Sequence, residues 1–357
     1  MLRKFSLAVI AAISFFASFS QDTTKTLSFS GSIDAYYRYN FSGQQNNYTS
    51  FTNSQNSFEL GMASLKADAT AMSGKVGATI DLGFGRRAEE FSYNDGDADA
   101  GKNGFASLAV IKQAFLTYNV SPKIKFTAGK FATHVGYELV DAPLNRNYSM
   151  SYMFTNGPFF HTGLKADITA GRVGFMLGVT NYTDQSTSST AVKNLIAQIS
   201  GSSKNGKLKM FLNYSGFAGS DSGKNPSALK SLHQIDLVVN ATLSSKFGIG
   251  YNSTIQQRKP ILENCGSWKG NALYLNYDPN SSIGLTLRSE YIIDNRSIYF
   301  STKNIFANTL SLIYKVGPLT VIPELRFENA NNTFYLKKDG LSTKSTASAL
   351  IAAIYKF

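Results

Sequence analysis

The sequence predicts an all-β protein, a transmembrane antiparallel β-barrel of about 16 strands, with 14–18 allowed. Three observations predict this class. Stretches of about ten residues alternate between apolar and polar side chains along most of the chain. Long and short connections alternate regularly between these stretches. The last stretch ends in an aromatic residue, Phe357.

The composition fits a membrane barrel better than a soluble domain. Of the 357 residues, 16% are charged and 13% are aromatic, whereas soluble domains average roughly 25% charged residues. The net charge is +12, but the basic residues are scattered singly and form no patch that would indicate a nucleic-acid partner. The single cysteine excludes a disulfide framework.

Residues 1–20 are predicted to be a cleaved secretory signal peptide. Arg3 and Lys4 precede an apolar run that is too short for a membrane-spanning helix, and the predicted cleavage falls before Gln21. No later run approaches the length of a transmembrane helix. We therefore expect one mature barrel domain, residues 21–357, in a bacterial outer membrane.

The alternation is clear at residues 74–84. Every second residue from Val76 to Phe84 is apolar, and the residues between them are polar or glycine. Two different faces on one strand indicate that each face meets a different environment. The same pattern predicts strands at 27–38, 58–70, 74–84, 110–120, 123–131, 161–170, 172–181, 193–201, 206–216, 232–243, 246–256, 268–277, 282–293, 304–314, 318–327 and 346–357.

The connections distinguish a membrane barrel from a soluble β-sandwich. Outer-membrane barrels have short periplasmic turns and longer outer loops, an asymmetry that a sandwich has no reason to keep. Trp268 and the many Tyr and Phe residues near strand ends fit interfacial girdles. The predicted long connections are 39–57, 85–109, 132–160, 182–192, 217–231, 257–267, 294–303 and 328–345.

The inward faces of the predicted strands carry charged side chains. Barrels of roughly 16–18 strands leave an aqueous channel, and unpaired charges in a dry interior would cost several kcal/mol each. We therefore expect a water-filled lumen that these groups line; the simpler interpretation is that each one only solvates the lumen. They are Asp34, Arg38, Asp81, Lys165, Asp167, Asp236, Arg288, Glu290, Glu324 and Arg326.

The third long connection, residues 132–160, is more apolar and aromatic than its neighbours. Loops normally lie on the surface and are polar, so this one is expected to pack against the barrel wall. We predict that it folds into the lumen and narrows it; the alternative is an outer cap packed on neighbouring loops. The predicted constriction residues are His134, Glu138, Asp141, Arg146 and His161.

The same segment carries a family resemblance. Between Gly129 and Gly163 it contains Gly136-Tyr137-Glu138, Gly157-Pro158-Phe159 and His161-Thr162-Gly163. With these motifs the chain resembles the OmpL-like β-barrel porins that are common in Bacteroidota. It departs from their pattern at His134, where the family often has proline, and at Met150, where a basic residue is common. The resemblance implies an outer-membrane porin and names no solute; a terminal Phe357 would be read by the barrel-insertion machinery.

Two motifs were weighed for other chemistry. Asp95, Asp97 and Asp99 alternate, but an EF-hand would need Gly and Glu where Ala100 and Ala106 stand. A calcium loop that bridges lipopolysaccharide is therefore an alternative to a solvated acidic loop. The chain has three histidines and no G-x-S-x-G elbow, so no enzyme and no cofactor are expected.

Taken together, the sequence predicts a porin for passive diffusion of small hydrophilic solutes or ions. The lumenal arginines and a mature charge of +10, which is +12 less Arg3 and Lys4, predict a mild anion preference. The expected partners are outer-membrane lipid, lipopolysaccharide, the barrel-insertion machinery and small solutes, with oligomers allowed and no nucleic acid. The alternatives are a closed barrel with a structural, adhesion or surface-binding role, and a barrel-embedded hydrolase.

Overall fold

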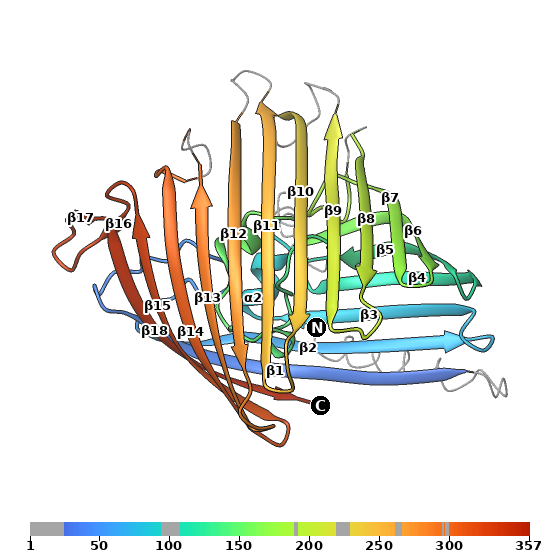
Figure 1. The fold of residues 1–357 in the computed structure, drawn as a ribbon, viewed down its shortest axis with the longest axis horizontal. Coiled ribbons are helices and arrows are strands. Elements are labelled where there is room, and N and C mark those ends of the chain that lie inside the picture. The colour runs from blue at the N-terminus through green and yellow to red at the C-terminus, as the bar shows by residue number, and fades with distance from the viewer. Residues whose placement is uncertain are drawn as a thin grey trace, which may run out of the picture.

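The sixteen-stranded barrel is confirmed. The strands form one closed antiparallel barrel, in which β1 (Thr26–Asn40) pairs with β18 (Ser345–Lys356) (Figure 1). Closure leaves no unpaired edge strand in the barrel. The computed structural model describes residues 25–93, 108–188, 192–218, 229–260, 266–294, 296 and 300–357.

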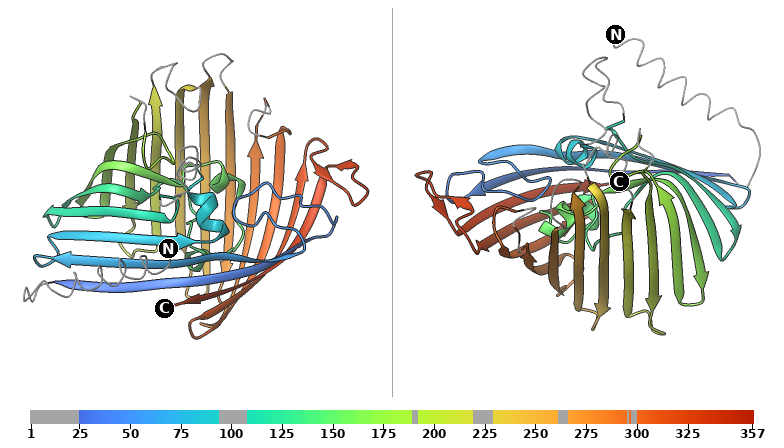
Figure 2. Two further views of the ribbon diagram at one scale, coloured as in Figure 1. Left: turned by 180° about the vertical axis from the view of Figure 1, so that it is seen from behind. Right: turned by 90° about the horizontal axis from the view of Figure 1, so that it is seen from above.

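The other barrel strands follow one another around the wall in sequence order, each paired with its predecessor. In Figure 2 the first strands cross those of the middle of the chain at a steep angle, as strands on facing walls of a tilted barrel do. The bounds are β2 (Ser57–Ala71), β3 (Val76–Phe84), β4 (Ile111–Ser121), β5 (Ile124–Ala132), β6 (Phe160–Ala170), β7 (Val173–Thr180), β8 (Asn194–Ser202), β9 (Leu208–Ala218), β10 (Leu229–Thr242), β11 (Phe247–Pro260), β12 (Gly266–Tyr277), β13 (Ile283–Ile293), β14 (Asn304–Val316) and β15 (Leu319–Ala330).

The largest differences from the predicted bounds lie at one hairpin. β10 starts before the predicted residue 232, and β11 continues past the predicted residue 256 to Pro260. The backbone ladder continues there, with Leu229 opposite Pro260. The residues from Gln256 onward are polar on both faces, so alternation gives no signal where the hairpin extends beyond the apolar band.

The two faces of the barrel differ as the alternation predicts. On β3, the outward Val76, Ile80 and Phe84 are 37%, 50% and 50% exposed, whereas the inward Asp81 is 2% exposed. Apolar side chains face the surroundings and polar side chains face the lumen, which is the arrangement of a barrel in lipid.

Trp268 was wrongly predicted to lie in an interfacial girdle. It points inward and is 0% exposed, and its Nε1–H donates to Oε1 of Gln256 at 3.3 Å. Gly270 and Ala272 follow it on the same inward face of β12. Their small size makes room for Met153, which packs in one buried cluster with Trp268 and Ala272.

One end of the barrel carries the short turns, and the other carries the long connections; we call them the short-turn end and the long-loop end. The long connections contain α2 (Arg86–Phe91), η1 (Ala142–Leu144), α4 (Tyr152–Thr155) and the hairpin of β16 (Tyr335–Leu336) and β17 (Ser342–Thr343). In the described part of the chain, no helix is long and apolar enough to cross a membrane.

Two predicted features lie outside the described residues. The signal peptide falls within residues 1–24, and the aspartates of the calcium loop, Asp95, Asp97 and Asp99, fall within residues 94–107. Both remain predictions from the sequence.

Candidate functional site

The connection between β5 and β6, residues 132–160, is bonded to the inward faces of strands around the barrel. It forms hydrogen bonds with side chains of β1, β4, β10, β11, β13, β14 and β15. Every residue from Asn147 to Phe154 is 9% exposed or less. A polar backbone this deeply buried requires hydrogen-bond partners.

The side chains of β13 and β15 supply many of those partners. We call the lumenal side chains Arg288, Glu290, Glu324, Arg326 and Glu328 the charged wall. Nη1 of Arg288 lies 2.6 Å from Oε1 of Glu138, and Nε of Arg288 lies 3.0 Å from Oε1 of Glu290. Arg326 lies 3.2 Å from Glu290 and 2.9 Å from Glu328. Arg288, Glu290, Arg326 and Glu328 thus form, with Glu138, a connected ion-pair network.

The same wall accepts hydrogen bonds from backbone N–H groups of the segment and donates hydrogen bonds to its carbonyl oxygens. Glu324 accepts from the N–H groups of Tyr148 and Ser149 at 2.5 and 3.0 Å. Glu290 accepts from the N–H of Tyr152 at 2.8 Å. Arg288 donates to the carbonyl oxygens of Ser149 and Met150 at 2.6 and 3.2 Å. Charge-assisted bonds of this kind are stronger than neutral ones, so they stabilise the docked segment.

Three more predicted lining residues also bond to protein groups. Asp34 accepts a hydrogen bond from the Tyr148 hydroxyl. Nη1 of Arg38 donates to the carbonyl oxygens of Gln45 and Ser54 at 2.9 and 2.8 Å. Asp81 lies 3.0 Å from Nζ of Lys112. These side chains point inward as predicted, but their partners are protein groups.

Lys165 and Asp167 of β6 pair with each other at 3.2 Å and are partly exposed. The expectation that inward charges require water is therefore wrong for most of the set, because ion pairs and backbone groups satisfy them. Three carboxylates, Glu138, Glu290 and Glu328, pair with two guanidiniums, Arg288 and Arg326. These two arginines thus provide no cationic excess for an anion preference.

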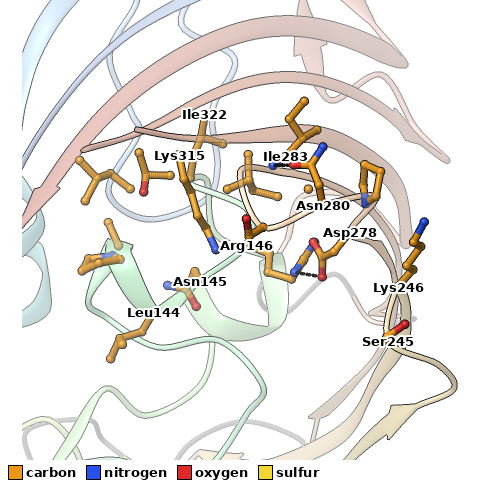
Figure 3. A pocket seen from close by; sticks show the side chains of 18 residues that line it. Leu144, Asn145, Arg146, Ser245, Lys246, Asp278, Asn280, Ile283, Lys315 and Ile322 are labelled. Carbon is orange, nitrogen blue, oxygen red and sulfur yellow. Dashed lines mark hydrogen bonds and ion pairs between the residues drawn. The ribbon is translucent and has the colours of Figure 1, made fainter. Parts of the chain in front are cut away.

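The predicted constriction residues lie at separate places on the segment. Glu138 joins the charged wall, and Asp141 pairs with Lys112 on β4. Arg146 lies near the short-turn end, where Nη2 is 2.7 Å from Oδ1 of Asp278 (Figure 3). The structure does not bring these three residues together into one narrow ring.

His134 and His161 form a pair beside β9. Nε2–H of His134 donates to the carbonyl oxygen of Tyr214 at 2.9 Å, and its ring lies 5.5 Å from that of His161. Burial lowers the pKa of His134 to about 4, so the ring is neutral at physiological pH. Nε2 of His161 lies 3.2 Å from Oγ1 of Thr133.

A different set of side chains lines the part of the lumen beyond β12. We call Gln198, Asn213, Gln234, Asp236, Asn252, Thr254 and Gln256, on β8–β11, the amide wall. Asn213 and Asn252 donate to the two oxygens of Asp236 at 2.8 and 2.5 Å, and Gln198 donates to Asn213 at 2.8 Å. Gln256 donates to Gln234 at 3.0 Å. Apart from Asp236, all of these side chains are uncharged amides or hydroxyls.

Cavities lie at both ends of the barrel. At the short-turn end, a cavity of about 710 Å³ is lined by Arg146, Lys246, Asp278 and Lys315 among others (Figure 3). At the long-loop end, a cavity of about 370 Å³ is lined by Tyr93, Tyr182, Gln234 and Gln256 among others. A void of about 10 Å³ lies between Gly157 and Asp236; we call it the neck.

Sequence reasoning missed three residues that hold the segment. Arg87 of α2 is fully buried and donates to the carbonyl oxygens of Val140 and Tyr148 at 3.1 and 3.2 Å. Lys112 bridges Asp81 and Asp141. Alternation could have found Glu328, which shares the inward face of Glu324 and Arg326. It could not have found Lys112, which by parity falls on the face of the exposed Leu116 and Tyr118 and is turned inward by a register shift between β3 and β4. No local signal marks Arg87.

Among the residues that the structure describes, no cluster of three or more His, Cys, Asp or Glu side chains could hold a metal ion. The His134–His161 pair lies next to Lys165, whose charge disfavours a cation there.

Sixteen antiparallel strands, closed around a polar lumen with an apolar exterior, define an outer-membrane β-barrel of the porin type. The family model described as "Putative beta-barrel porin-2, OmpL-like" matches residues 26–357. The chain belongs to this family.

Solved structures share the fold. The outer-membrane channel DcaP of Acinetobacter baumannii matches with a TM-score of 0.64 and 13% identity over 95% of this chain and 99% of that chain. An anion-selective porin from Comamonas acidovorans matches with a TM-score of 0.64 and 10% identity over 93% and 100%. The trimer form of Vibrio cholerae OmpT matches with a TM-score of 0.62 and 13% identity over 93% and 99%. No curated protein matches the sequence.

Proposed function

We propose that the protein is a passive diffusion channel for small hydrophilic solutes across the outer membrane. The observation that carries this proposal is a closed sixteen-stranded barrel with a polar lumen and cavities at both of its ends. Barrels of this strand number are wide enough for an aqueous channel. The short-turn end faces the periplasm, as in bacterial outer-membrane barrels.

We further propose that residues 132–160 set the size limit of the channel. Buried contacts of Asn147–Phe154 with several strands support a constriction rather than an outer cap. Because the neck holds about 10 Å³, room for little more than one water, solute passage requires part of this segment to move.

Other functional expectations enter as parts of the same proposal. The protein acts without catalysis, and its apolar exterior contacts membrane lipid and, at the outer leaflet, lipopolysaccharide. Phe357 at the end of β18 is the signal for the barrel-insertion machinery. The trimer form of Vibrio cholerae OmpT, which shares this fold, supports an oligomer here.

Single-channel recording from refolded protein in a planar bilayer, with a KCl gradient across it, tests the proposal. Stepwise openings are expected, and the reversal potential gives the sign of ion preference. Because Arg288 and Arg326 are paired, we expect no marked anion preference. Absence of current from a barrel with heat-modifiable gel mobility would contradict the channel.

The narrowness of the neck favours one alternative, a barrel closed by residues 132–160 that has a structural, adhesion or surface-binding role. Permeation of larger sugars separates the two proposals. If residues 132–160 constrict a channel, a variant in which this segment is released should admit larger sugars that the wild type excludes. If the barrel serves only as a scaffold, neither the wild type nor that variant should pass any solute.

A further inference from the structure

The cavity at the long-loop end continues toward the neck along the amide wall. Gly157, Pro158 and Gln234 line both the cavity and the neck. Beyond the neck, toward the short-turn end, the inward Gln198 and Asn240 are partly exposed. Polar inward side chains of β8–β11 therefore lie on both sides of the neck.

The two walls are buried to a similar extent, since Gln234, Asp236 and Asn252 are only 1–3% exposed, but the charged wall also holds the segment by an ion pair with Glu138. Arg288 and Glu290 are 0% and 1% exposed. Tyr152 and Met153 of the segment pack in one buried cluster with Trp268, Tyr274 and Ile292. A solute following β13–β15 would have to break this cluster and the ion-pair network beside it.

The lining of the neck has a defined chemistry. Gln234 and Asn252 contribute amides, and Thr254 contributes a hydroxyl; the amide nitrogen of Asn252 already donates to Asp236 and to the carbonyl oxygen of Leu237. Asp236 is the one ionisable side chain among the described residues that line the neck. It already accepts hydrogen bonds from Asn213, Asn252 and the N–H of Gly136, and all of these donors are neutral.

Such a lining suits a solute that exchanges hydrogen bonds with water for hydrogen bonds with amides and hydroxyls. A charged solute loses hydration there and gains no opposite charge, except that a cation is attracted by Asp236. An anion is both dehydrated and repelled by that carboxylate.

We infer that solutes cross along the amide wall, and that the neck selects uncharged polyhydroxylated solutes such as monosaccharides and disfavours anions. This inference rests on the proposed diffusion function and adds to it a route and a substrate class. Gly157 controls the route, because a Cβ at this position would lie 3.2 Å from the carbonyl oxygen of Met153 and 3.6 Å from Nε2 of Gln234. A branched side chain would fill the neck.

The test compares initial uptake of labelled glucose, gluconate and protonated glucosamine into proteoliposomes of the full chain, with valinomycin and potassium present to prevent a membrane potential. These probes have similar size and different charge. Glucose should enter fastest and gluconate slowest, about tenfold slower, which corresponds to a barrier difference of about 1.4 kcal/mol.

Two variants test the route, and a matched one serves as control. Gly157→Val should reduce glucose uptake by about tenfold, the same barrier difference. Gly201→Val on β8, where the nearest other atom to an added Cβ is 4.0 Å away, should leave uptake unchanged. Asp236→Asn should reduce the difference between the uptake rates of gluconate and glucose.

The outcomes distinguish this inference from the proposed function. Equal or faster uptake of gluconate, or normal glucose uptake through Gly157→Val, would overturn the inference while the channel stands. A folded wild-type barrel that passes no solute and no current would overturn both.

Discussion

The charged wall and the amide wall share the same barrel architecture, yet they bind residues 132–160 in different ways. The charged wall meets the segment with ion pairs and charge-assisted hydrogen bonds, such as Arg288 to Glu138 at 2.6 Å. The amide wall meets it with fewer, neutral-donor contacts, such as the N–H of Tyr137 to Asn252 at 3.3 Å. The comparison teaches that the charged wall anchors the segment, whereas the amide wall, although equally buried, holds it by weaker contacts that a moving segment can break.

The difference has a physical cause in the backbone that each wall covers. Between Tyr148 and Tyr152 the chain is buried, and its N–H and carbonyl groups would otherwise have no partners. Carboxylates and guanidiniums supply several bonds each. Near Gly157 the backbone borders cavities, where water can satisfy polar groups.

The largest expected effect comes from breaking the anchor at Arg288. In Arg288→Met, Glu138 loses its ion pair and Glu290 loses one of two arginines. Removing one partner of a buried pair typically costs about 3–5 kcal/mol. We expect residues 138–152 to leave the charged wall, which raises single-channel conductance and exposes the segment to proteolysis while the barrel stays folded.

A second substitution and a matched control identify the cause. Glu138→Gln added to Arg288→Met removes one orphaned charge and should restore part of the protease resistance. Arg172→Met, in the exposed turn between β6 and β7, should change neither measurement. Wild-type conductance from Arg288→Met would mean that the charged wall does not hold the segment.

Acid should loosen the segment through His134 by a smaller amount. Its folded pKa of about 4 lies below the ordinary 6.5, so the docked state resists protonation. The stability that the neutral ring contributes is fully present above pH 6.5 and is lost as the pH falls toward 4. Once His134 is protonated in both the docked and the released state, the docked state has lost about 3 kcal/mol of stability.

Conductance and protease resistance of wild type and His134→Asn, followed between pH 7 and 4, check this prediction. The Asn amide can still donate to the carbonyl oxygen of Tyr214 but does not titrate. The difference between the two proteins isolates His134 from carboxylates that titrate in both. If the two proteins change in conductance and protease resistance in parallel as the pH falls, His134 is not the group whose protonation loosens the segment.

The sequence predicted the barrel well and its interior only in part. Alternation identified sixteen strands and their inward faces, because the lipid and the lumen impose opposite polarity on successive residues. Alternation states which way Glu324 points, but not whether it meets water or the backbone of Tyr148. The contact between Glu138 and Arg288 joins residues 150 positions apart, and no local pattern encodes it.

The amide wall was missed for a related reason. An inward charge marks Asp236 in the sequence, whereas Asn213, Asn252 and Gln234 are uncharged amides, which carry no distinctive signal in an alternating strand. Yet their hydrogen bonds to Asp236 and to one another determine what the neck presents to a solute.

The smallest effect is expected at the tip of the segment, where Arg146 pairs with Asp278. Their side chains are 30% and 44% exposed, and exposed ion pairs contribute about 0–1 kcal/mol. Arg146→Ala should therefore leave protease resistance and the glucose-to-gluconate ratio near wild type, while enlarging the cavity at the short-turn end. A double-mutant cycle of Arg146→Ala with Asp278→Asn, read by denaturant unfolding, should give a coupling below about 1 kcal/mol. A coupling of about 3 kcal/mol or more, as for a buried pair, would place an anchor at the short-turn end as well. The contrast between one wall that anchors the segment by ion pairs and one that holds it by neutral-donor contacts would then no longer describe how the segment is held.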